Sequence, residues 1–388
     1  MKPKPNQILI KDIRKQLIEY FSSRGDFDFA KPTGLANPNI PVAYNPSAGF
    51  LEIKDYVCAD KKMPFKKFYI NEKSFRNVDS AVVGMSNRHL SFFEMFAFFF
   101  AGPDNLIAQQ KTEEELIKTT TDLLFNKFCL PKEKIVVTLF GGGSLANIDQ
   151  ISTEKNLIPL WMKYGILETN IIPTNGLRNF VANYQWGYAG ASYEIFYKID
   201  DDLLEIASTN KYKYWVKEET IKNKNYYVLS LSPNFVYGTG FGLERLSLIL
   251  NRKNHIFDIP DLLEPLKLLR SFIPSELKTI SKLDDEHLEQ ILNGIRSIVF
   301  IMSEDVQPSG NRSREKILKN IIKNTLEELN YLGLHSKSFE IIKETAKMID
   351  RNYRDYYELK IDDTLSFLKN YLNSVDIKKK YSHLMQSE

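Results

Sequence analysis

Cysteine and histidine, the residues that most often build disulfide frameworks and metal centres, are scarce in this sequence. Its 388 residues include two cysteines, Cys58 and Cys129, and five histidines. Two distant cysteines support neither a disulfide framework nor a cysteine-based metal site. The histidines are scattered and lack the short spacing of zinc ligands. The sequence therefore predicts a protein of a reducing compartment.

Long apolar runs and a dominant charge are missing as well. No uninterrupted stretch approaches the roughly 18–20 apolar residues of a membrane-spanning helix, and residues 1–7 lack the apolar core of a secretion signal. We therefore expect a cytoplasmic protein without a membrane partner. The 52 basic and 49 acidic residues leave a net charge of +3, too balanced to indicate nucleic-acid binding by itself.

Hydrophobic periodicity divides the chain into two parts. Up to about residue 255, helix-like segments alternate with strand-like ones, which are 68–70, 135–140, 192–199, 203–208, 211–216 and 226–231. Beyond Pro260 only helical patterns remain, at 263–272, 285–302, 314–332, 338–349 and 361–372. The patterns predict an α+β domain over residues 1–258 and an all-helical domain over 259–388.

Two glycine-rich segments differ in what they indicate. Gly141–Ser144 lacks the lysine and hydroxyl residue of a phosphate-binding loop and is best interpreted as a turn. In Gly238–Leu246, three glycines precede a helix that begins Leu-Glu-Arg. Glycines allow close approach of a ligand, and Arg245 can reach a phosphate or stack on a base. The alternative is a tight turn before a helix with a surface arginine.

Two arginines flank a short loop upstream, which is typical of a polyphosphate clamp because each guanidinium can hold two phosphoryl oxygens. Arg76 ends Lys73–Arg76, and Arg88 begins Arg88–Met95, which also contains a glutamate and two phenylalanines. Alternatively, these two phenylalanines and those within residues 96–100 belong to the hydrophobic core.

Taken together, and in their order along the chain, these segments resemble alanyl-tRNA synthetases. Residues 88–95 resemble the second class-defining motif of that family and 238–246 the third. Residues 13–25 and 45–50 resemble the first motif, with Pro41 as its proline. Further matches in family order are 160–161, 178–180, 192–197, 204–207, 296–300 and 306–309. The resemblance extends over roughly residues 10–330 and covers the catalytic core and part of the tRNA-recognition domain. The family's editing and C-terminal domains have no counterpart here.

The resemblance implies an antiparallel sheet with flanking helices, followed by an all-helical domain. It also implies an AMP-forming ligase that uses ATP and Mg²⁺ to activate an amino acid as an aminoacyl-adenylate and transfers it to tRNA. The implied partners are the amino acid, ATP and a tRNA acceptor stem. Both a monomer and a homodimer are compatible with the family.

The same resemblance assigns the nucleotide side of the site. Arg76 and Arg245 are the implied catalytic residues, with Arg76 on the α-phosphate and Arg245 near the adenine or γ-phosphate. The implied nucleotide-binding set is Arg76, Arg88, Phe92, Phe93, Glu94, Glu205, Gly242 and Arg245. One of the two phenylalanines supports the adenine, and Glu205 is the expected Mg²⁺ ligand.

The amino-acid side departs from the family. Gly238 replaces the aspartate that pairs with the α-ammonium of alanine, Val181 replaces a tryptophan, and Asn210 replaces a valine. The implied substrate-binding set is Val181, Glu194, Asn210, Gly238 and Gly240. Because a desolvated ammonium without its partner is costly, we expect a substrate other than plain alanine. A larger or more polar amino acid fits, as does one whose amino group is held elsewhere.

The sequence also leaves undecided which molecule accepts the acyl group. The family's arginine-dense helix here contains Arg312, Arg314, Lys316, Lys319 and Lys323, with Asn320 in place of another arginine. Lysine neutralises phosphate but does not read base edges in a bidentate manner. Three hypotheses follow: a tRNA-charging enzyme, a paralogue that passes the acyl group to a small molecule, peptide or carrier protein, and a pseudoenzyme. The retained nucleotide-side residues favour an enzyme, and the helical part favours tRNA as acceptor.

Overall fold

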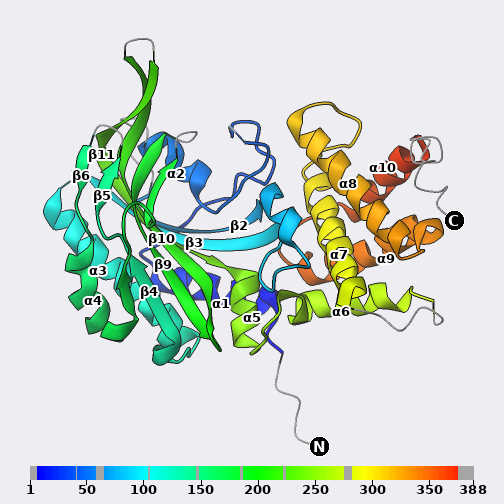
Figure 1. The fold of residues 1–388 in the computed structure, drawn as a ribbon, viewed down its shortest axis with the longest axis horizontal. Coiled ribbons are helices and arrows are strands. Elements are labelled where there is room, and N and C mark those ends of the chain that lie inside the picture. The colour runs from blue at the N-terminus through cyan, green and yellow to red at the C-terminus, as the bar shows by residue number, and fades with distance from the viewer. Residues whose placement is uncertain are drawn as a thin grey trace, which may run out of the picture.

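A sheet covered by helices forms one side of the protein and a group of helices the other (Figure 1). The computed structural model describes residues 7–40, 42–57, 65–103, 105–145, 148–183, 187–221, 224–274 and 282–374. Pro41 and Cys58 lie outside these residues. In the part of the chain described, no helix is long and apolar enough to span a membrane.

The main sheet has nine strands in the order β1-β2-β3-β11-β10-β9-β4-β7, with β8 paired to β9. The strands are β1 Asp28–Phe29, β2 Lys67–Phe75, β3 Phe92–Pro103, β4 Ile135–Leu139, β7 Ile171–Pro173, β8 Phe180–Asn183, β9 Tyr188–Ile199, β10 Asp202–Ile221 and β11 Lys224–Gly242. A small second sheet pairs β5 Gly143–Leu145 with β6 Ile148–Ile151. Apart from the parallel pairs β1–β2 and β4–β7, the main-sheet pairs are antiparallel. The predicted fold class is confirmed.

Each of the five helical patterns predicted beyond Pro260 forms a helix in the structure. The helices are α1 Ile10–Arg24, α2 Phe50–Val57, α3 Leu106–Asp122, α4 Ile158–Lys163, α5 Leu243–Leu250, α6 Pro260–Ser271, α7 Lys282–Met302, α8 Ser313–Tyr331, α9 Ser338–Tyr353 and α10 Ile361–Ser374. The sequence did not indicate α2, which follows residues 31–49, a segment rich in Pro, Asn and Gly. The two predicted strands at 203–208 and 211–216 form the single strand β10, with an irregularity at Tyr212/Tyr214.

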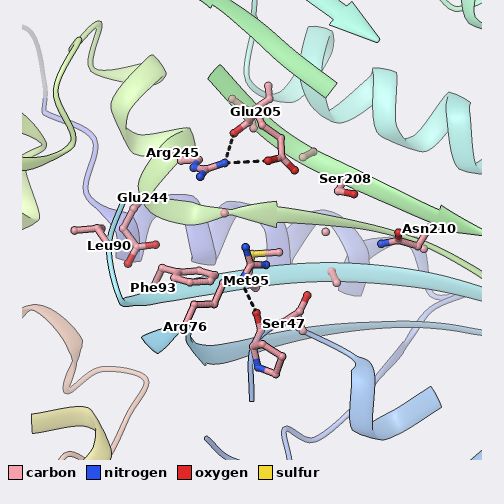
Figure 2. A pocket seen from close by; sticks show the side chains of 18 of the residues that line it. Ser47, Arg76, Leu90, Phe93, Met95, Glu205, Ser208, Asn210, Glu244 and Arg245 are labelled. Atoms are coloured by element: carbon pink, nitrogen blue, oxygen red, sulfur yellow. Dashed lines mark hydrogen bonds and ion pairs between the residues drawn. The ribbon is translucent and has the colours of Figure 1, made fainter. Parts of the chain in front are cut away.

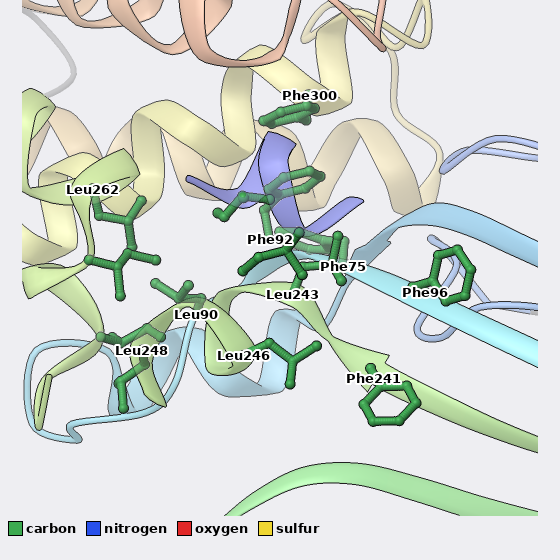
Figure 3. Packing of buried hydrophobic residues seen from close by; sticks show 14 of the residues in the cluster. Phe75, Leu90, Phe92, Phe96, Phe241, Leu243, Leu246, Leu248, Leu262 and Phe300 are labelled. Atoms are coloured by element: carbon green, nitrogen blue, oxygen red, sulfur yellow. The ribbon is translucent and has the colours of Figure 1, made fainter. Parts of the chain in front are cut away.

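Alternation along β3 places its even-numbered side chains, several of them aromatic, on one face of the sheet, where α1 and α7 cover them. Phe21 of α1 packs on Phe96 and Phe98, with ring centroids 5.5 and 5.0 Å apart. Phe92 stacks on Phe300 of α7 at 3.6 Å with an interplanar angle of 8° (Figure 3). The even-numbered residues of β3 are therefore core residues.

Buried polar contacts join the helical part to the sheet. Glu94 of β3 accepts hydrogen bonds from Arg14 of α1 and from the Tyr357 hydroxyl after α9, at 2.8 Å each. Arg296 of α7 pairs with Glu244 of α5 at 3.0 Å. All described strands precede α5, and the helices α6 to α10 follow it. These contacts attach α7 and the segment after α9 to the face of the sheet that α1 covers. The domain boundary at residues 258/259 stays a prediction.

The buried carboxyl of Glu289 on α7 predicts a pH-dependent stability. Burial, together with the negative charges of Asp285 and Asp258, raises the pKa of Glu289 from 4.5 to about 8. The folded state thus holds this proton more tightly than the unfolded state, so its contribution to stability is lost as pH rises from about 4.5 to about 8. Denaturant unfolding at several pH values in this window should show wild type losing stability, and Glu289→Gln should lose less. An unchanged slope in the variant would contradict this account.

Candidate functional site

A pocket lies over the middle of the sheet, on the face away from α1, and its floor is a row of glycines. Gly238, Gly240 and Gly242 alternate along β11 and point the same way. The strand register places Phe99, Ala97 and Met95 of β3 beside them on one side. On the other side, Asn210 and Ser208 of β10 lie opposite Gly238 and Gly240. At Gly242, where an added Cβ would meet only the Met95 sulfur at 4.0 Å, a flat ligand can approach the backbone closely.

Three arginines, Arg76, Arg88 and Arg245, line one end of this pocket. Figure 2 shows Arg76 and Arg245 there. Arg245 of α5 donates to the Glu205 backbone oxygen at 2.9 Å and to its carboxylate at 3.3 Å. Arg88 donates to the Leu203 carbonyl at 2.8 Å and pairs with the Asp202 carboxylate. Both arginines are therefore held by residues of β10.

Arg76 completes this end of the pocket from the end of β2. Its Nε donates to the Pro46 carbonyl at 3.1 Å, and its guanidinium carbon lies 5.1 Å from the centre of the Phe93 ring. Burial lowers the pKa of the nearby His89, and the surrounding arginines lower it further. An end with this much positive charge and a half-buried aromatic ring, Phe93, suits an anionic aromatic ligand such as a nucleoside phosphate.

The other end of the pocket is mostly apolar. Its lining includes Ala48, Ile53, Met95, Ala97, Phe99, Val181 and Tyr212, with Ser208 and Asn210 as polar members. A Cβ added at Gly238 would lie 2.2 Å from Cδ1 of Phe99. Any larger residue at 238 thus requires the Phe99 ring to move.

The structure brings most of the predicted site residues together. The pocket is lined by Arg76, Arg88, Phe93, Val181, Glu205, Asn210, Gly238, Gly240, Gly242 and Arg245. Several lining residues were not predicted, among them Ser47, Asp79, Met95, Phe99 and Ser208. Met95 and Phe99 follow from strand alternation once Phe93 is known to face the pocket, whereas Ser47 and Asp79 lie in loops and carry no such signal.

Two predicted site residues require correction, Phe92 and Glu94, and a third, Glu194, lies beside the residues that line the pocket. Phe92 and Glu94 were assigned to the nucleotide pocket, but both are fully buried on the opposite face of β3, where Glu94 pairs with Arg14. Because side chains alternate along a strand, Phe93 faces the pocket and its two neighbours cannot. Glu194 lies on β9, one strand beyond the pocket, and accepts a hydrogen bond from Thr138 at 3.4 Å. Burial and the charge of Glu205 raise its pKa.

Magnesium is compatible with this donor set. No group of three or more potential metal-ligating side chains occurs in the described ranges. A Mg²⁺ ion bound with a nucleotide, however, uses one or two carboxylates and completes its shell with phosphate oxygens and water. Glu205 offers such a carboxylate, with 41% of its side chain exposed. Its pairing with Arg245 leaves one carboxylate oxygen for a cation.

The sequence of the chain decides its family. A family model described as "tRNA synthetases class II (A)" matches residues 12–374. The chain belongs to this class II synthetase family. The alanine–tRNA ligase of Ureaplasma parvum is 28% identical over 390 residues, which cover 93% of this chain and 40% of that protein. The alanine–tRNA ligase of Rickettsia canadensis is 25% identical over 389 residues, with coverages of 95% and 40%.

The class II synthetase chain thus spans about 40% of the length of these curated relatives. Among solved structures, pyrrolysyl-tRNA synthetase from Desulfitobacterium hafniense is similar with a TM-score of 0.33 and 13% identity, covering 65% of this chain and 72% of that one.

One arginine of the predicted RNA-binding helix, Arg314, makes its contacts inside the protein. Arg314 of α8 donates to the carbonyl of Ala36 at 2.9 Å and also to those of Asn37 and Ala43. The Tyr44 hydroxyl donates in turn to the Arg314 carbonyl at 2.8 Å. Arg314 therefore fixes the position of the loop around residues 36–43, which leads to α2. Among the other basic positions of this segment, Arg312, Lys316 and Lys323 are exposed.

Proposed function

We propose that this protein is an AMP-forming ligase that activates a carboxylic acid as an acyl-adenylate and transfers the acyl group to a tRNA. One observation supports the proposal above all: Arg76, Arg245 and Glu205 converge beside the Phe93 ring at one end of a glycine-floored pocket in a member of the class II family. ATP would occupy the arginine-rich end, and the acid would occupy the apolar end.

The chemistry requires positioning and electrostatics rather than a protein nucleophile or base. The substrate carboxylate is already anionic and attacks the α-phosphorus directly. A new carboxyl oxygen–phosphorus bond forms, the bond from phosphorus to the bridging oxygen breaks, and pyrophosphate leaves. Arg76 would stabilise the charge that builds up on the α-phosphoryl oxygens. Mg²⁺ held by Glu205 and phosphate oxygens would supply further charge neutralisation.

The ion pairs at the nucleotide end fit this role. Arg88 and Arg245 are paired with Asp202 and Glu205, whose side chains are 69% and 41% exposed. A triphosphate offers more oxygens to a guanidinium than an exposed carboxylate does. ATP binding would therefore transfer these arginines from protein carboxylates to phosphates.

For the acyl substrate, we propose an acid other than plain alanine. The support is Gly238, which provides no carboxylate, and the Phe99 ring that fills the space above it. Alanine-dependent ATP–pyrophosphate exchange at ordinary alanine concentrations would contradict this part of the proposal.

Transfer to tRNA is tested with RNA labelled at its 3′-terminal adenosine. Purified protein, ATP and the activated acid should convert the label to the 3′-ester, and periodate-oxidised RNA should remain unmodified. Pyrophosphate exchange without any esterified RNA would favour the second candidate, transfer to a small molecule, peptide or carrier protein. The use of Arg314 within the protein favours this second candidate, because it removes one arginine from the expected RNA-binding helix.

A further inference from the structure

Arg314, at the start of α8, uses its whole guanidinium group on one loop. Its Nε donates to the carbonyl of Ala43, its Nη1 to that of Ala36 at 2.9 Å, and its Nη2 to that of Asn37. The Tyr44 hydroxyl donates in return to the Arg314 carbonyl at 2.8 Å. Hydrogen bonds from a charged donor are roughly twice as strong as neutral ones, and the planar guanidinium makes several of them at fixed angles. A single residue of the helical part therefore holds both ends of this loop.

The residues that follow the loop are hydrogen-bonded around Arg76. Asn45 is fully buried, its N–H donates to the Leu35 carbonyl at 2.9 Å, and its carbonyl accepts from the N–H of Phe75 at 2.8 Å. Phe75 ends β2 and directly precedes Arg76. The next residue of the loop, Pro46, accepts from the Arg76 Nε at 3.1 Å. The loop thus fixes both the backbone that leads to Arg76 and the Arg76 side chain.

The other two arginines of the nucleotide end are supported elsewhere. Arg88 and Arg245 are held by residues 202–205 of β10. A shift of the loop should therefore displace Arg76 and leave Arg88 and Arg245 in place. Arg76 is the residue assigned to the charge that builds up on the α-phosphoryl group, whereas all three arginines bind the triphosphate. A displaced Arg76 should consequently lower kcat more than the affinity for ATP.

We propose that Arg314 is a positioning residue for the adenylation step. It acts on the reaction through the loop and Arg76 rather than by contact with ATP or the acid. Through α8, the helical part of the protein thus contributes to the first reaction step without any RNA. The inference rests on the proposed function, because the role of Arg76 belongs to that proposal.

Substitutions of Arg314 test this role in ATP–pyrophosphate exchange. Arg314→Met removes the donors to all three carbonyls, so kcat should fall at least about tenfold, since a small misplacement of a catalytic group is already that costly. The KM for ATP should change by less than about twofold. Arg314→Lys keeps the charge without the planar fork and should recover part of the lost kcat. Arg354→Met removes an arginine that is 61% exposed and lies just after α9, and it should behave like wild type.

A double variant separates the positioning of Arg76 from general damage to the fold. If Arg314 acts through Arg76, adding Arg314→Met to Arg76→Ala should lower kcat by less than a further factor of about two, because residues that act as a unit are not additive. Thermal unfolding followed by circular dichroism shows whether each variant is folded, and Arg314→Lys replaces Arg314→Met in both comparisons if the latter is not.

Two results would overturn the inference and leave the proposed function standing. One is a wild-type kcat in folded Arg314→Met, and the other is a pair of losses that multiply in the double variant. No exchange by the wild-type protein with any acid would overturn both the inference and the proposed function.

Discussion

Replacing Arg76 with alanine should reduce acid-dependent ATP–pyrophosphate exchange by about 10²–10³-fold, the effect expected when a cation that stabilises transition-state charge is removed. Arg76 lies against Phe93 and is fixed by the Pro46 carbonyl, so its guanidinium is positioned before the nucleotide arrives. The charge on the α-phosphoryl group increases as the carboxylate attacks. The loss should therefore be larger in kcat than in the affinity for ATP.

Two further variants make this test specific to Arg76. Arg76→Lys keeps the charge without the planar fork and should retain part of the activity. Arg351→Ala removes an arginine from the exposed part of α9 and should behave like wild type. An Arg76→Ala protein that folds normally and exchanges pyrophosphate at the wild-type rate would remove Arg76 from the mechanism.

Replacing Arg14 with methionine should lower the free energy of unfolding by about 3–5 kcal/mol, because it leaves a buried carboxylate without its cation. Arg14 and Glu94 are 2% and 0% exposed and form two parallel hydrogen bonds of 2.9 and 2.8 Å. Asn71 and Tyr357 also donate to Glu94, at 3.0 and 2.8 Å. The pair therefore holds α1, the sheet and the segment after α9 together, and urea unfolding followed by circular dichroism measures its loss.

The matched control for Arg14 lies on the same helix. Lys15 is 74% exposed, and Lys15→Met should change stability by no more than about 0.5 kcal/mol. The double variant Arg14→Met/Glu94→Leu removes both charges and should be more stable than Arg14→Met alone. If Arg14→Met were no less stable than Lys15→Met, the buried pair would not be what joins these elements.

Local patterns were sufficient for much of the fold and for most of the nucleotide end. The three-glycine segment with Leu-Glu-Arg correctly preceded a helix, and α5 begins at Leu243. Arg76, Arg88 and Arg245 were recognised from their motifs and do line the pocket. Such predictions succeed because periodicity and motif order depend on residues close together in the sequence.

The failures have a common physical cause, which is contact between distant segments. Alternation separates Phe92 from Phe93, but only the packing of α7 against the sheet decides which of them is buried. Glu94 resembled a pocket residue until its partner Arg14, 80 residues away, was known. Arg314 resembled an RNA contact, yet its carbonyl partners lie more than 270 residues earlier in the chain.

The central claim is that the pocket adenylates a carboxylic acid, and the most direct test is ATP–pyrophosphate exchange by purified wild-type protein with a panel of amino acids and other carboxylic acids. The account predicts exchange that depends on at least one acid and on Mg²⁺. Absence of exchange with every acid, in protein shown to bind ATP, would contradict it.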